Sequence, residues 1–143
     1  MTASAAMARF GWNLLALVTA QAAHSVEEYL GRLWEVFPPA RAVTSLVSSD
    51  LERGFLIVNV GLAVFGLWCV FWPARRGWRI AVPLAWLWVG IELINGIGHP
   101  LWSLSRLRYT PGVATAPVLL VLALLLARRL RTRGQSLDPE PTP

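Results

Sequence analysis

Four apolar stretches are spaced along the chain, separated by segments rich in arginine, proline and polar side chains. The clearest stretch, residues 54–72, contains no charged residue. With a rise of about 1.5 Å per residue, a helix of this length nearly crosses a hydrocarbon core of about 30 Å. Residues 80–98 have a similar length but include two polar side chains, Glu92 and Asn95. Residues 113–130 become long enough to span if their terminal arginines reach the headgroups.

The first stretch, residues 10–30, begins apolar and becomes polar from Gln21 onwards. Its polar residues keep helical spacing, which predicts one membrane span over the whole stretch. Arg9, the apolar residues after it and the small-residue pattern at 20–22 also fit a cleavable signal peptide. The sequence leaves this alternative open.

These patterns predict an all-α integral membrane protein with a four-helix transmembrane bundle as its single domain, residues 1–130. Residues 131–143 are polar and rich in proline, which predicts a disordered tail. Residues 31–53 connect the first two spans, and two consecutive prolines at 38–39 exclude one continuous helix there.

The placement of arginine predicts the orientation of the bundle. Residues 73–79 carry three arginines and the chain after residue 127 carries four, whereas residues 31–53 balance three arginines with three acids. Positively charged loops stay in the cytoplasm. We therefore expect both termini in the cytoplasm and a multi-pass protein of the bacterial inner membrane.

Composition supports a membrane protein and excludes several other classes. The chain is 55% hydrophobic and has a net charge of +5, with thirteen basic residues that are all arginine. In a soluble protein this charge would suggest nucleic-acid binding, but here the arginines flank the apolar stretches, so we expect the lipid bilayer as a partner and no nucleic acid. Cys69 is the only cysteine, so an intrachain disulfide cannot form.

Both histidines of the chain stand at helical spacing from carboxylates. His24, Glu27 and Glu28 are related as i, i+3 and i+4, which places them on one face of the first span. In the third span Glu92 and His99 share a face with Asn95, and Trp88 lies one turn earlier. Both spans run outward, and both patches lie roughly 18 to 21 Å along their helices, so we expect them to converge.

Ionisable side chains are costly inside a bilayer, so such a cluster indicates a functional site by default. We predict catalytic roles for six residues: His24, Glu27, Glu28, Glu92, Asn95 and His99. Glu28 is the candidate acid, because burial and the neighbouring Glu27 both favour its protonated form. A purely structural clamp between helices is the alternative.

Three short motifs occur in order along the chain: HSVEE at 24–28, NGIGH at 95–99 and YTPGVAT at 109–115. Together they resemble the bacterial membrane proteins named for the HXXEE motif, over about residues 10–127. The resemblance implies that Tyr109, Pro111 and Gly112 belong to the site together with His24, Glu27, Glu28, Asn95 and His99. It implies no particular reaction.

The leading hypothesis is an enzyme that isomerises or cyclises a lipophilic, isoprenoid or sterol-like molecule by acid–base chemistry and needs no cofactor. Trp88, Tyr109 and Thr115 are then candidates for substrate binding. The overall plan is similar to that of emopamil-binding-type sterol isomerases, as an analogy without sequence alignment.

Two alternatives remain open. His24, Glu28 and His99 would suit zinc or iron in a metal-dependent enzyme. A non-enzymatic carrier or accessory protein is the second alternative, and a four-helix chain in that role would need to form a homodimer.

Overall fold

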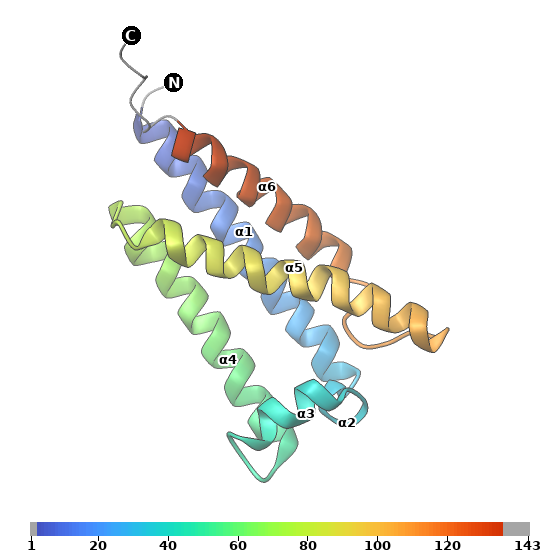
Figure 1. Ribbon diagram of the computed structural model, residues 1–143. Helices are drawn as coiled ribbons and strands as arrows, with labels where there is room; N and C mark the ends of the chain where they lie inside the picture. The colour runs from blue at the N-terminus through green and yellow to red at the C-terminus, as the bar shows by residue number, and fades with distance from the viewer. Residues whose placement is uncertain (1–2, 136–143) are drawn as a thin grey trace.

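The computed structural model describes residues 3–135, and these form helices with no strand among them. Three long helices cross in the upper part of Figure 1: α1 (Ala3–Leu30), α5 (Ala81–Arg106) and α6 (Ala116–Gln135). The fourth, α4 (Leu51–Cys69), lies along the other side of α1 and continues into a π-helical turn, η1 (Val70–Ala74). The start of α1 and the end of α6 lie at one end of the molecule, as both termini in one compartment would require.

Two of these helices, Leu51–Ala74 and Ala81–Arg106, are long and apolar enough to cross a membrane. The other two predicted spans coincide with α1 and α6, so each predicted span is a helix. The four-span arrangement and its orientation stay predictions.

The helices are longer than the apolar stretches that predicted them. α5 continues beyond residue 98 through Pro100 to Arg106, and α6 runs to Gln135. Residues 131–135, expected at the start of a disordered tail, therefore belong to a helix, and the rest of that tail lies outside the described residues. Hydropathy reports where a helix is apolar, whereas its hydrogen bonds continue into polar sequence.

Two short helices connect α1 to α4, so this segment is not one continuous helix, as the prolines at 38–39 predict. α2 (Leu33–Val36) ends at Phe37, which is extended, with φ −118°. α3 (Pro38–Ser45) begins with both prolines in its first turn, where their missing N–H groups are tolerated. This segment lies below the end of α1 in Figure 1 and brings the aromatic residues Trp34 and Phe37 near the bundle.

Glycines allow the long helices to approach closely at two places. A Cβ on Gly66 of α4 would lie 2.7 Å from Trp88 of α5 and from Val18 of α1. A Cβ on Gly96 of α5 would lie 2.9 Å from the backbone of Leu120 in α6. Tight packing at these points fixes the positions of α1, α5 and α6, which carry or support the polar cluster.

Candidate active site

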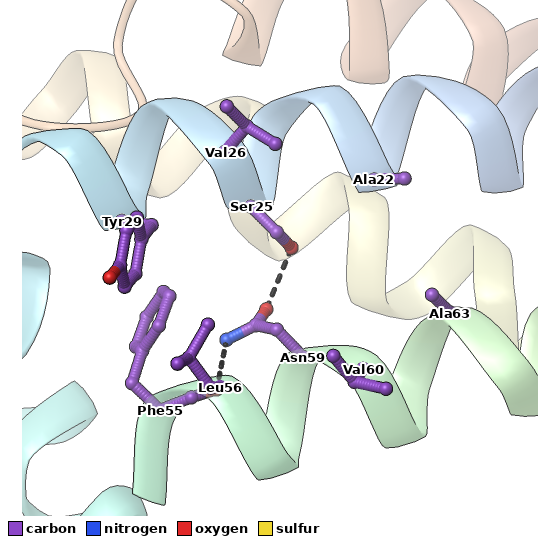
Figure 2. A pocket seen from close by; sticks show the side chains of 9 residues that line it. All are labelled: Ala22, Ser25, Val26, Tyr29, Phe55, Leu56, Asn59, Val60 and Ala63. Carbon is purple, nitrogen blue, oxygen red and sulfur yellow. Dashed lines mark hydrogen bonds between the residues drawn. The ribbon is translucent and has the colours of Figure 1, made fainter. Parts of the chain in front are cut away.

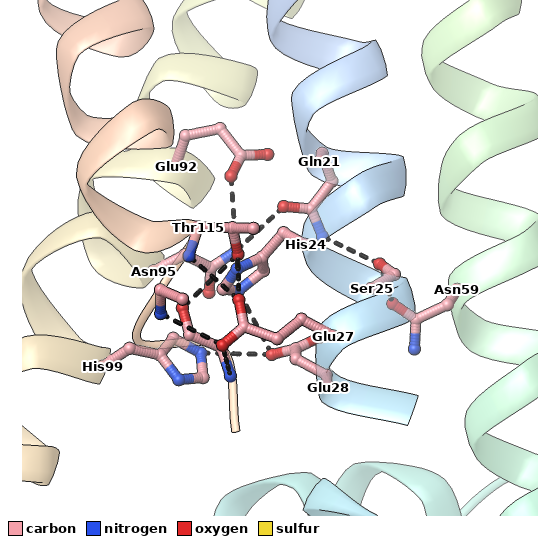
Figure 3. Close-up of polar contacts among 12 residues, drawn as sticks. Gln21, His24, Ser25, Glu27, Glu28, Asn59, Glu92, Asn95, His99 and Thr115 are labelled. Atoms are coloured by element: carbon pink, nitrogen blue, oxygen red, sulfur yellow. Dashed lines mark hydrogen bonds and ion pairs between the residues drawn. The ribbon is translucent and has the colours of Figure 1, made fainter. Parts of the chain in front are cut away.

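Three elements bring polar side chains together inside the bundle (Figure 3). α1 contributes Gln21, His24, Glu27 and Glu28 at successive turns of its inner face, and α5 contributes Glu92, Asn95 and His99. The third element is the loop before α6, residues 107–115. His24 and Glu92 are 0% exposed, whereas His99 and Glu28 are 6% and 7% exposed. The structure thus brings together the two patches that the sequence predicted to converge.

Glu27 anchors the loop before α6. Its Oε1 accepts hydrogen bonds from the Tyr109 hydroxyl at 2.6 Å and from the backbone N–H groups of Gly112 and Ala114 at 3.1 and 3.0 Å. Its Oε2 accepts from the backbone N–H and the hydroxyl of Thr115, at 2.9 and 2.6 Å. A carboxylate at the N-terminus of α6 also satisfies N–H groups that lack helical partners.

The hydrogen bond from Tyr109 to Glu27 has a consequence for the tyrosine. Together with burial and the negative charge of Glu27, this bond raises the pKa of Tyr109 from 10.0 to about 12. Tyr109 therefore stays a neutral hydrogen-bond donor over the whole physiological pH range.

Gly112 is required by both its backbone conformation and its surroundings. Its φ is +92°, a region that side-chain-bearing residues rarely adopt. A Cβ at this position would lie 2.6 Å from the ring of His99 and 2.8 Å from the ring of His24. The loop can therefore lie directly against both imidazoles only because residue 112 is glycine.

Thr115 connects the loop to the first histidine. Its hydroxyl lies 2.7 Å from Nδ1 of His24 and donates to Glu27 Oε2. A continuous chain of hydrogen bonds therefore runs from Glu27 through Thr115 to His24, and it fixes the orientation of the imidazole.

Glu28 stands between the two histidines. Its Oε1 lies 3.3 Å from His24 Nε2 and 3.1 Å from His99 Nε2. The two imidazole rings meet edge to face, with centroids 4.7 Å apart. The geometry between His24 Nε2 and Glu28 is that of an ion-pair contact without a hydrogen bond, because this nitrogen has no hydrogen-bond partner in the structure. We call the three side chains His24, Glu28 and His99 the junction.

Among residues 3–135, the junction is a group that could hold a metal ion. Each of its three side chains offers one ligand atom, and these atoms lie within 4.8 Å of one another. Phe37 and Trp102 lie beside His99, each with a ring centroid 6.4 Å from the imidazole.

Glu92 forms a second polar centre with amide side chains. Asn95 Nδ2 donates to Glu92 Oε2 at 3.3 Å and to Gln21 Oε1 at 3.2 Å. Gln21 Nε2 donates to Ser25, whose hydroxyl donates to Asn59 of α4 at 2.7 Å. This centre therefore connects α5 through α1 to α4.

Asn59 and Ser25 also line a groove between α1 and α4, with a volume of about 220 Å³ (Figure 2). Most of the lining is apolar, and the rings of Tyr29 and Phe55 close one end. The groove lies on the other face of α1 from the junction.

The predicted site residues thus occupy different positions. The three substrate candidates do not surround a common cavity: Trp88 is fully buried against Gly66 and Val18, and Tyr109 and Thr115 bind Glu27. Sequence reasoning missed Ser25 and Asn59. The only signal was a single asparagine within the apolar stretch 54–72, and its partner could not be identified from helical spacing.

The chain matches the protein family described as "Protein of unknown function with HXXEE motif" over residues 15–127. No curated protein and no solved structure shows a significant match to it.

Proposed function

Since the chain belongs to the HXXEE family, whose function is unknown, we propose its function from the geometry of the cluster: it is a membrane enzyme that performs acid–base chemistry on a lipophilic molecule. The observation that carries this proposal is the complete burial of His24 and Glu92, with Glu28 and His99 nearly as buried. Ionisable groups are retained at such positions mainly where they act on a substrate or an ion. Amide side chains would suffice for a clamp between helices.

The proposal includes four membrane spans, α1, α4 with η1, α5 and α6, with the arginine-rich end in the cytoplasm. The junction and the loop before α6 then lie toward the outer side of the membrane. Arginine distribution supports this orientation, and the location is the inner membrane of a bacterium.

Glu92 is the group that carries the proton in this mechanism, because its surroundings suit both protonation states. One end of the Gln21 amide lies 2.8 Å from Glu92 Oε2. With nitrogen at that end, the amide donates to an ionised Glu92. With oxygen at that end, the amide accepts a hydrogen bond from neutral Glu92, while its nitrogen donates to Ser25. Rotation of one amide group therefore accommodates loss or gain of a proton.

The junction is the place where the reacting group of the substrate is polarised or held. The apolar part of the substrate lies against Phe37 and Trp102, whose rings stand beside His99. An isoprenoid or sterol-like molecule matches apolar rings next to a few polar groups. Isomerisation or cyclisation is the reaction class that requires a proton donor and a separate acceptor.

The proposal is tested by mass spectrometry of lipids that co-purify with the full-length protein, followed by incubation of the identified compound with fresh enzyme. We expect one lipophilic compound to be enriched and converted to an isomer of equal mass. Glu92→Gln retains the hydrogen bonds but carries no transferable proton, so conversion should fall by about 100-fold or more. Equal conversion by Glu92→Gln and the wild type would exclude Glu92 as the proton carrier.

A further inference from the structure

We propose that His24, Glu28 and His99 bind one zinc ion per chain at the junction. This inference rests on the proposed function, because the ion would polarise the substrate there. The three ligand atoms lie within 4.8 Å of one another, and Glu28 Oε1 is 3.3 and 3.1 Å from the two Nε2 atoms. His24 Nε2, one of these atoms, is buried and has no hydrogen-bond partner.

Thr115 occupies one nitrogen of His24. The hydroxyl of Thr115 donates to Glu27 Oε2 and lies 2.7 Å from His24 Nδ1. Nε2, on the other side of the ring, is therefore the nitrogen that is left to bind a ligand.

Nε2 of His24 faces Glu28 without a hydrogen bond between them. This nitrogen is buried, has no hydrogen-bond partner, and lies 3.3 Å from the carboxylate oxygen. A metal ion held between the imidazole nitrogen and the carboxylate would give both atoms a partner.

The two separations from Glu28 suit zinc, whereas the ligand atoms as a set are within 4.8 Å of one another, so the two histidine nitrogens approach each other when the ion binds. Ligands about 2.0–2.1 Å from a tetrahedral zinc ion are about 3.3 Å apart, and two histidines with one glutamate form a known catalytic zinc set. The observed distances from Glu28 to the two histidines agree with that separation. Three protein ligands leave a fourth position for water or substrate.

The support around His24 is also typical of a metal ligand. Histidines that bind metals usually donate their other N–H to a carboxylate, directly or through a neighbouring group, which fixes the ring. His24 does so through Thr115 to Glu27. The HXXEE motif thus provides two ligands and, in Glu27, the residue that supports one of them.

The test measures the metal content of full-length protein purified in detergent, by elemental mass spectrometry. We expect about one zinc per wild-type chain. Glu28→Gln and His99→Gln should each lose most of this metal. Glu92→Gln is the matched control, because it removes a buried carboxylate outside the ligand set and should retain the metal. Circular dichroism and gel filtration select variants that remain folded.

A titration of metal-depleted protein with Co²⁺ tests the support from Thr115. Thr115→Val, which keeps the shape but lacks the hydroxyl, should weaken Co²⁺ binding by about 10- to 100-fold, whereas Thr115→Ser should bind as the wild type does. Tetrahedral cobalt is recognised by its visible absorption.

Wild-type protein free of zinc, zinc content equal in all variants, or stoichiometric iron in place of zinc would each overturn the zinc site. The proposed function fails separately. Conversion of the lipid by wild-type protein that contains no zinc as purified would refute the zinc site and leave the enzyme in place. Stoichiometric zinc that depends on the three ligands, without conversion of any co-purified lipid, would retain the site and count against the proposed function.

Discussion

Glu27 and Glu28 are adjacent in the sequence, and the fold gives their carboxylates opposite surroundings. Glu27 accepts five hydrogen bonds from Tyr109, Gly112, Ala114 and Thr115, so every oxygen is satisfied by neutral donors. Glu28 is more buried, and its contacts are two imidazole nitrogens, one of which lacks a hydrogen-bond partner.

This difference separates a residue that holds the structure from one that is available for chemistry. Hydrogen bonds from neutral donors stabilise the ionised form of the carboxylate, so it has no proton to transfer. A carboxylate between two imidazoles can bind a cation or transfer a proton. Four substitutions test this difference between the two glutamates.

The largest effect is expected for Glu28→Gln. The amide keeps the size of the carboxylate but loses its charge and its ability to bind a cation, so conversion of the co-purified lipid should fall by about 10³-fold. The protein should remain folded in detergent, because Glu28 anchors no loop. Full activity of a folded Glu28→Gln variant would remove Glu28 from the reaction.

Glu27→Ala should affect stability instead. It leaves the donors of the loop before α6 without their acceptor, and we expect the free energy of unfolding to fall by about 3 kcal/mol. Thermal unfolding in detergent measures this change, with Glu28→Gln as the matched comparison. If Glu28→Gln lowered the melting temperature more than Glu27→Ala, the division between the two glutamates would be wrong.

Gly112→Ala tests the close approach of the loop to the histidines. The added Cβ would meet the rings of both His99 and His24, and φ of +92° is strained for alanine, so we expect a loss of about 2 kcal/mol. Gly98→Ala is the control: its Cβ would have no neighbour within 4 Å, and alanine favours the helix by about 1 kcal/mol. Equal melting temperatures for the two variants would contradict the packing at Gly112.

The smallest effect is expected for Tyr109→Phe, which removes one of the five hydrogen bonds to Glu27 and should lower stability by about 1 kcal/mol at pH 8. The pKa of Tyr109 rises from 10.0 to about 12 in the folded protein, chiefly through this bond. Its contribution is therefore complete below pH 10 and is lost as the pH rises through 12. Thermal unfolding should show a smaller difference between wild type and variant at pH 11 than at pH 8, and a constant difference would exclude this coupling.

Helical spacing in the sequence was sufficient to place His24, Glu27 and Glu28 on one face of α1, and Glu92, Asn95 and His99 on one face of α5. Side-chain direction repeats every 3.6 residues whatever the helix packs against, so these faces are local properties. The apolar stretches likewise located the four long helices, although polar sequence continues α5 to Arg106.

The partner that each side chain meets depends on how the helices pack together. Glu27 and Thr115 are 88 residues apart in the sequence, and no local pattern indicates that this carboxylate binds a loop while its neighbour faces two histidines. Successive residues of a helix point about 100° apart, so Glu27 and Glu28 face different neighbours once α5 and α6 are in place. Packing against glycines fixes those positions, because close contact between helices depends on the shapes of both surfaces.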